Sequence, residues 1–160
     1  MTGPDDPFRL PRHVIPIRYE IRLEPNFDKA QFDGQEAVTV TVLQQTTVIV
    51  MNAAELSVSQ AYLDNEQKQR LDAAVELNEA LQRCRLTFAQ TVTPGQWRLV
   101  ILFRGTLNDK LRGFYRSTYK DASGLTQTMA ATQFEATDAR RAFPCWDEPD
   151  FKAVFATTLV

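Results

Sequence analysis

Alternation of apolar and polar residues with a period of two is the feature that most restricts the folds open to this chain. Successive side chains of a β-strand point to opposite faces, so an alternating segment predicts a strand with one buried face. Tyr19, Ile21 and Leu23, for example, alternate with charged residues. Further alternating or short β-branched segments lie at 37–42, 46–51, 56–59, 82–88 and 97–103. Many short strands without interleaved long helices predict a mainly β fold, an antiparallel β-sandwich.

The segment 65–84 allows two interpretations. It is rich in Glu, Gln, Leu, Ala and Arg and contains neither Gly nor Pro, so intrinsic propensity favours a helix. The alternative is a β-hairpin, in which Leu71 and Val75 lie in an alternating first strand. Its turn would lie near Asn78, and its second strand would run to Phe88. The residues alone leave both interpretations open.

The last third of the chain has fewer clean alternations. Asp-Ala-Ser-Gly at 121–124 predicts a turn. A short helix is expected to begin at an N-cap formed by Thr137 or Asp138 and to end before Pro144. The segment 151–160 alternates again up to the last residue, which predicts a strand. Because a natural domain seldom ends inside a strand, we expect a fragment of a longer protein.

Length and composition limit the class of protein. The chain has 160 residues, enough for the core of one β domain over 1–160. Its 18 basic and 20 acidic residues are spread without runs, which predicts no nucleic-acid partner and no membrane-binding basic surface. The N-terminal region carries acids and prolines where a signal peptide needs basic and then apolar residues, so we expect a cytoplasmic location and no membrane span. Cys84 and Cys145 are too few for a disulfide scaffold; we expect reduced thiols, with a mutual bridge as the alternative.

The segment 132–149, TQFEATDARRAFPCWDEP, is the most unusual stretch of the chain. Together with 113–119 (GFYRSTY) and 48–56 (VIVMNAAEL), it resembles the N-terminal domain of the gluzincin zinc aminopeptidases, most closely the puromycin-sensitive ones. The similarity runs in order from about Phe8 to Val160, which is nearly the whole chain. The resemblance implies the N-terminal, cleft-forming domain of an enzyme that removes N-terminal residues from peptides.

The resemblance also carries expectations about fold and cofactor. In that family the domain is a large, mostly antiparallel, saddle-like β-structure packed against a catalytic domain, and the region matching 65–88 is strand, which favours the hairpin. The family's zinc is bound by a His-Glu-x-x-His helix and a later glutamate, and neither occurs in this chain. His13 is the only histidine, whereas a catalytic zinc takes three protein ligands. We therefore expect zinc in the longer protein, no metal site or catalytic residue in this chain, and a surface or packing role for His13.

The resemblance further implies that Gln133 and Glu135 bind substrate. In the family, the glutamine and the acid of a Thr-Gln-x-Glu pattern line the pocket for the first residue of a peptide substrate, and 132–135 has that pattern. A carboxylate can accept a charge-assisted hydrogen bond from the substrate's α-ammonium group, which is largely protonated at neutral pH. Gln133 can offer a donor and an acceptor to the same substrate residue. The alternative is that Glu135 only forms an ion pair with Arg140 or Arg141.

Other residues of 132–149 are expected to be structural. Asp147 and Glu148 could form an acid–base pair, but a solvated or salt-bridged turn is the favoured interpretation. Cys145 has no histidine near it in the sequence to activate it as a nucleophile. The leukotriene hydrolases, relatives that also open an epoxide, carry glutamine where this chain has Glu135, so Glu135 favours a plain aminopeptidase. A non-catalytic scaffold or protein-binding module with an exposed apolar surface is the alternative function.

Overall fold

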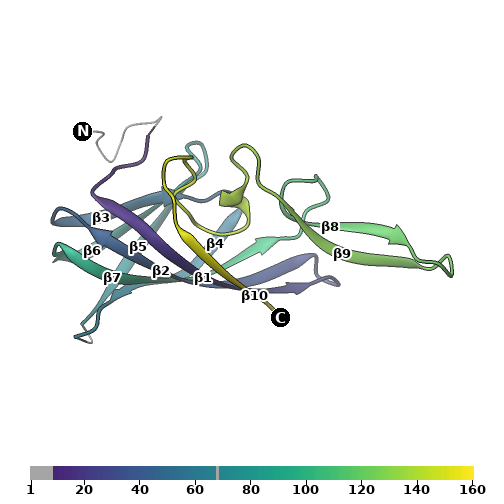
Figure 1. The fold of residues 1–160 in the computed structure, drawn as a ribbon, viewed down its shortest axis with the longest axis horizontal. Coiled ribbons are helices and arrows are strands. Elements are labelled where there is room, and N and C mark those ends of the chain that lie inside the picture. Colours follow the sequence, from purple (N-terminus) through teal and green to yellow (C-terminus); the bar gives the residue numbers. More distant parts are fainter. Residues whose placement is uncertain (1–8, 68) are drawn as a thin grey trace.

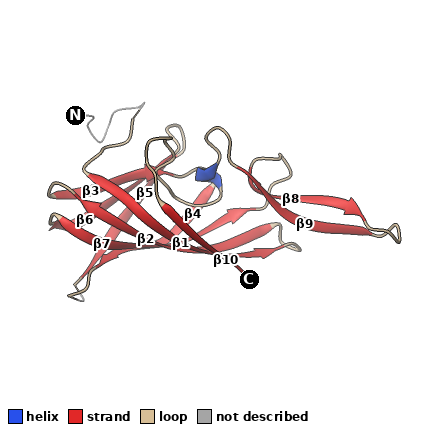
Figure 2. Cartoon of the chain, in the orientation of Figure 1, coloured by secondary structure: helices blue, strands red, loops and turns tan. Residues whose placement is uncertain are grey.

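The computed structural model describes residues 9–67 and 69–160, and strands dominate it (Figures 1 and 2). The predicted mainly β fold is therefore confirmed. The only helical element among the described residues is a 3-10 turn, η1 (Ala139–Arg141). The described residues therefore contain no helix that is long and apolar enough to cross a membrane. The strands are β1 (Val14–Asn26), β2 (Gln31–Val42), β3 (Thr46–Asn52), β4 (Leu56–Asp64), β5 (Arg70–Asn78), β6 (Arg83–Val92), β7 (Gly95–Thr106), β8 (Gly113–Lys120), β9 (Thr126–Gln133) and β10 (Val154–Leu159).

The main sheet has eight strands in the order β10-β1-β2-β7-β4-β5-β6-β3, and β8 and β9 form a separate two-stranded sheet. The sheet bends at β5, whose first residues pair with β4 and whose residues Ala73 to Asn78 pair with β6. One continuous, curled sheet is thus the form that the predicted sandwich or saddle takes. Every strand pairing is antiparallel, as predicted, except that β10 runs parallel to β1.

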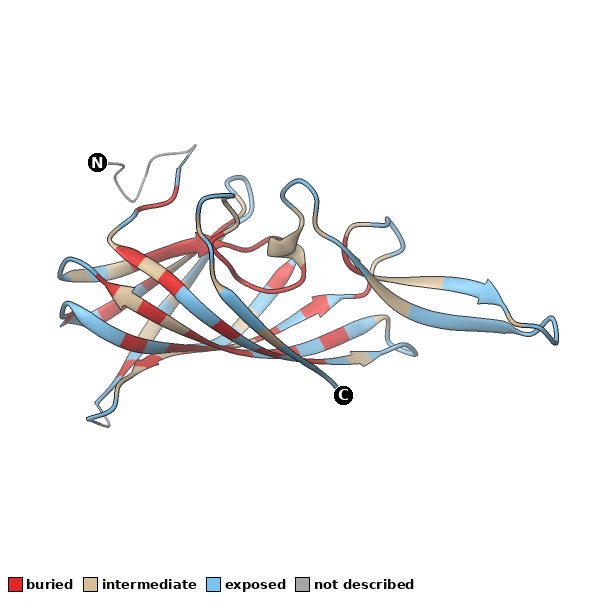
Figure 3. Ribbon diagram, viewed as in Figure 1, coloured by how far each residue is buried: buried red, intermediate tan, exposed pale blue. Residues whose placement is uncertain are grey.

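The core lies on the inner side of the curled sheet (Figure 3). Alternate residues of the central strands point into it, as the period-two pattern predicts; Val38 and Val40 of β2 and Leu99 of β7 are fully buried. Because the sheet curls, Tyr19 of β1 and Ile49 of β3 belong to the same core although their strands lie far apart in the sheet order.

Two phenylalanines pack over two glycines between β2 and β7. Phe32 lies opposite Gly105 and Phe103 lies opposite Gly34, so each ring covers the glycine on the neighbouring strand. A Cβ atom at either glycine would overlap the opposite ring. The two rings also meet edge to face, with centroids 6.5 Å apart. These glycines are therefore required by close packing.

The strands β5 and β6 form a hairpin over 70–92, and no described residue of 65–84 is helical, which confirms the interpretation taken from the family resemblance. The turn lies where it was expected: the side-chain Oδ1 of Asn78 accepts a hydrogen bond from the backbone N–H of Leu81 at 3.0 Å. Leu71 is buried, Val75 is half-buried and the residues between them are more exposed, apart from Ala73. The first residues of β5 pair with β4 and the others with β6, so each part of the strand has a partner for its backbone groups, and this outweighs the helical propensity.

The expected helix after Asp138 is only the single turn η1, and the predicted side-chain cap is wrong. Asp138 occupies the N-cap position but makes no capping hydrogen bond. Its Oδ1 instead accepts a hydrogen bond from Nε of Arg141 at 2.7 Å. The ion pair with Arg141 thus takes the place of the cap, and the turn ends before Pro144.

The β8–β9 hairpin projects beyond the main sheet (Figure 1). The predicted turn at 121–124 joins its strands; the N–H of Gly124 donates to the carbonyl of Asp121 at 2.9 Å. β9 ends at Gln133, after which the chain returns to the main sheet and forms a two-way backbone bridge between Asn52 and Cys145. We call the segment 134–153 the return segment. It carries Glu135, one of the two residues that the sequence predicts to bind substrate, and Gln133 directly precedes it.

Candidate functional site

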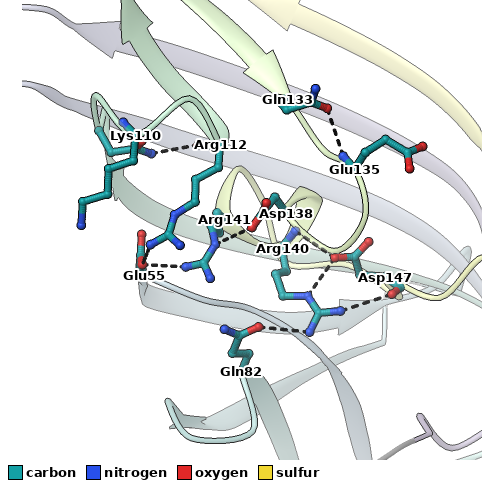
Figure 4. A network of polar contacts seen from close by, with 11 residues as sticks. Glu55, Gln82, Lys110, Arg112, Gln133, Glu135, Asp138, Arg140, Arg141 and Asp147 are labelled. Carbon is teal, nitrogen blue, oxygen red and sulfur yellow. Dashed lines mark hydrogen bonds and ion pairs between the residues drawn. The ribbon is translucent and has the colours of Figure 1, made fainter.

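Gln133 ends β9 and Glu135 lies at the start of the return segment, and both are exposed. Gln133 is the last residue of β9, and its Oε1 accepts a hydrogen bond from the backbone N–H of Glu135 at 3.1 Å (Figure 4). This contact closes a tight turn and uses one lone pair of the Gln133 amide, so the two Nε2 hydrogens stay available as donors. The structure thus brings the two predicted substrate-binding residues together in one turn.

The carboxylate of Glu135 points away from Arg140 and Arg141 (Figure 4). Among the described residues it has no ion-pair or hydrogen-bond partner, whereas each arginine pairs with other acids. The alternative in which Glu135 only neutralises one of these arginines is therefore wrong. A free carboxylate at the rim of the fold can receive a cation from outside.

Arg140 anchors the return segment to the main sheet. Its Nε donates to Oδ2 of Asp147 at 2.8 Å, and both side chains are almost buried, with 12% and 13% of their surface exposed. A second guanidinium nitrogen lies 3.3 Å from Oε1 of Gln82 in the β5–β6 turn. The backbone carbonyl of Arg140 accepts a hydrogen bond from the N–H of Ala54 at 2.9 Å. Arg140 therefore joins the return segment both to the β3–β4 connection and to the β5–β6 turn.

Arg141 makes a second anchor through Glu55, which lies between β3 and β4. The guanidinium of Arg141 lies 2.6 Å from Oε1 of Glu55 and 2.7 Å from Oδ1 of Asp138. Arg112, just before β8, reaches the same Glu55 oxygen at 2.9 Å. Sequence reasoning missed both Glu55 and Gln82, since each lies far from the return segment along the chain and no local motif marks it.

Asp147 and Glu148 do not form an acid–base pair. Asp147 is engaged by Arg140, while Oε1 of Glu148 accepts the backbone N–H of Leu10 at 2.5 Å. Oε2 of Glu148 lies 3.3 Å from the guanidinium of Arg9. The favoured interpretation was a solvated or salt-bridged turn, and the structure shows the salt-bridged one.

The cysteines are free and buried, and neither is placed as a nucleophile. Burial, with the nearby charges of Asp147 and Glu36, raises the pKa of Cys145 well above its usual value. Burial and then Glu36 raise the pKa of Cys84 to about 12. Both groups are therefore thiols at neutral pH, whereas a nucleophile must be a thiolate.

The described residues do not fit a catalytic zinc. No three of their histidine, cysteine, aspartate and glutamate side chains gather as a ligand set. The only histidine, His13, is half-buried with Nε2 3.1 Å from the carbonyl oxygen of Val48, which matches the expected packing role. No chemical step through a metal can be built from this part of the chain.

Comparison with protein families gives a match to the Peptidase M1 N-terminal domain over residues 15–160. The chain belongs to the peptidase M1 family. Aminopeptidase M1-D of Oryza sativa subsp. japonica is 47% identical to this M1 domain over 152 residues, and the puromycin-sensitive aminopeptidase of Caenorhabditis elegans is 40% identical over 154 residues. The alanine/arginine aminopeptidase of Saccharomyces cerevisiae is 40% identical over 157 residues. The resemblance to the aminopeptidases is thus confirmed.

Each of these alignments covers 94% of the M1 domain but only 16% to 18% of the relative's own length. The parts of the relatives that lie outside the alignment are therefore several times longer than the part within it. Membership of the family establishes an N-terminal domain of the aminopeptidase type. It leaves the roles of Gln133 and Glu135 as predictions.

Proposed function

We propose that this M1 domain is the N-terminal domain of a longer zinc aminopeptidase, and that Glu135 binds the α-ammonium group of a peptide substrate. The observation that carries the proposal is that the carboxylate of Glu135 has no partner among the described residues, whereas Arg140 and Arg141, which follow it in the sequence, are both paired with other acids. An unpaired acid in this position gives the turn a local negative charge. Because Arg140 and Arg141 are paired with other acids, neither forms an ion pair with Glu135 that an approaching cationic group would have to replace.

The chemistry of an N-terminal amine suits this turn. A free α-amino group has a pKa of about 7.7–8.0 and is largely a cation at neutral pH, whereas an internal peptide nitrogen carries no charge. Glu135 would accept a charge-assisted hydrogen bond from the ammonium, which is about twice as strong as a neutral one. The free Nε2 hydrogens of Gln133 would donate to a carbonyl of the same substrate residue. The pair would thus select free N-termini and hold the first residue in one orientation.

The zinc of such an enzyme would be held by residues outside this M1 domain. When bound, a catalytic zinc polarises the scissile carbonyl and activates a water molecule. The role proposed for this domain is to orient the substrate, with no proton transferred by Glu135. The expected partners are peptide substrates and a catalytic domain of the same longer chain. The cytoplasmic location stays a prediction.

The test uses the longer protein with Glu135→Ala and Glu135→Gln, assayed on a peptide with a free N-terminus and on its N-acetylated form. Loss of a hydrogen bond between two charged groups should lower kcat/KM for the free peptide by about 10- to 100-fold, the equivalent of about 1.5–3 kcal/mol. The matched control is Glu79→Ala, an exposed acid in the β5–β6 turn. Unchanged kinetics in both Glu135 variants would remove this residue from the site.

A non-catalytic binding module is the second candidate, favoured by the apolar residues that β10 exposes. Val154 and Phe155 each leave more than half of their surface exposed, at 57% and 55%. An exposed apolar edge strand needs a covering partner, which a catalytic domain or a binding partner could supply. Absence of aminopeptidase activity in the longer protein would favour the binding module.

A further inference from the structure

Four aromatic rings connect the turn that holds Glu135 to the main sheet. The ring of Phe134 meets that of Phe143 edge to face, with centroids 6.0 Å apart. Phe143 meets Tyr19 of β1 in the same way at 6.1 Å. Tyr19 is stacked on Phe155 of β10 at 4.7 Å. The rings form a continuous path from the proposed substrate site to the sheet edge.

Phe134 lies between the two proposed substrate-binding residues in the sequence but faces the opposite way. Gln133 and Glu135 are exposed, whereas the ring of Phe134 is half-buried and packs against the core. The backbone carbonyl of Phe134 also accepts a hydrogen bond from the N–H of Asp138 at 3.0 Å. Phe134 therefore fastens the turn to the fold through both its side chain and its backbone.

The far side of the aromatic path is held firmly. Phe143 and Tyr19 are buried, and the Tyr19 hydroxyl accepts a hydrogen bond from the N–H of Trp146 at 3.3 Å. The N–H of Asp147 donates to Oδ1 of Asn52 at 3.2 Å. A ring anchored on such a surface can fix the position of the turn that it belongs to, because close-packed interiors transmit displacements.

We propose that Phe134 is a positioning residue for substrate binding: its ring, packed on Phe143, fixes where the carboxylate of Glu135 stands. This inference rests on the proposed function of Glu135. Without the Phe134 ring, the turn that carries Glu135 keeps its backbone hydrogen bonds but loses the side-chain packing that fixes its position relative to the main sheet. A misplacement of about 1 Å can cost about 100-fold in rate when a group acts by orienting the substrate.

The experiment is a double-mutant cycle in the longer protein, with Phe134→Ala, Glu135→Ala and both changes together, assayed with a free-amine peptide. Phe134→Ala alone should lower kcat/KM by about tenfold or more. In the Glu135→Ala background its further effect should be clearly smaller, because only the contribution of Gln133, which belongs to the same turn, is left to lose. Phe134→Leu, which keeps most of the apolar volume, should recover most of the activity.

Phe151→Ala is the matched control. Phe151 is also half-buried and packs against the same core, but its ring lies under Arg12 and outside the aromatic path. The Phe151→Ala variant should lower the melting temperature about as much as Phe134→Ala does, but it should leave kcat/KM unchanged.

If Phe134→Ala and Glu135→Ala lower activity by independent factors, or if Phe151→Ala lowers it as much as Phe134→Ala does, the positioning role is refuted. If Glu135→Ala itself leaves kcat/KM unchanged, the proposed function of Glu135 is refuted, and the positioning role of Phe134 falls with it. Should Phe134→Ala not fold, the same cycle with the larger Phe134→Val decides: a loss of activity that shrinks in the Glu135→Ala background supports positioning, and one that persists undiminished refutes it.

Discussion

Replacing Glu36 by Met should stabilise this domain, and increasingly so as the pH rises. Glu36 lies on the core-facing side of β2, fully buried between Ile21 of β1 and Ile101 of β7. Neither carboxylate oxygen has a hydrogen-bond partner among the described residues. Burial raises the pKa of this carboxyl well above its usual value of 4.5, so the folded domain keeps the proton that the unfolded chain loses.

Two costs follow from this burial. A buried polar group without a hydrogen bond costs about 1–3 kcal/mol, and Met, of similar length, removes that cost. Above pH 4.5 the folded state also binds more protons than the unfolded state, so the free energy of unfolding falls as the pH rises. The loss is about 1.4 kcal/mol per pH unit and continues until the pH reaches the raised folded pKa. Tyr19, Cys84 and Cys145 face Glu36 and have pKa values raised by burial, so they stay neutral in this range.

The assay is urea unfolding, monitored by tryptophan fluorescence, at a series of pH values from acidic to mildly alkaline. The free energy of unfolding of the Glu36→Met variant should exceed that of the wild type by about 1–3 kcal/mol near pH 4.5, and the difference should grow with pH. Glu36→Gln should remove the extra pH dependence but keep the cost of an unpartnered polar group. Gln35→Met, a change at the exposed neighbour, should stay within about 0.5 kcal/mol of the wild type. A difference between Met variant and wild type that does not change with pH would refute the reasoning.

Two further changes test the anchors of the fold. Arg140→Ala and Asp147→Ala should each lower the free energy of unfolding by about 3 kcal/mol, because each leaves the other, nearly buried charge without its partner. In urea unfolding, the loss in the double variant should be smaller than the sum of the two single losses. Additive losses would contradict the pairing. Gly34→Ala should cost about 1–3 kcal/mol by overlap with the ring of Phe103. Adding Phe103→Leu should recover part of that loss in thermal unfolding, and no recovery would mean that the ring is not the cause.

The strands of the main sheet could be predicted from the sequence because period-two alternation is a local property. Tyr19, Ile21 and Leu23 all face the core, as predicted. The alternation in 151–160 likewise predicted a strand at β10, but its parallel partner β1 could not be foreseen. A strand's pattern states which face is buried and says nothing of which strand lies beside it.

The hairpin over 70–92 shows where local signals are insufficient. Its composition favours a helix, and only the family resemblance decided against one. The physical reason for the strands is the presence of β4 on one side of β5 and β6 on the other. Such partners become available only when the whole sheet assembles.

By itself, the sequence determined most strands of the main sheet, the turn at 121–124 and the segment that carries Gln133 and Glu135, because each depends on neighbouring residues. It predicted no strand at β8 or β9, and it left the region of β5 open between helix and strand. Only the tertiary structure decided that Arg140 and Arg141 are held by Gln82, Glu55 and nearby acids. It also decided that Glu135 has no ion-pair partner within 9–67 and 69–160. Ion pairs and ring contacts between distant segments depend on how the sheet curls. That curl results from the packing of the whole core, which no single stretch of sequence specifies.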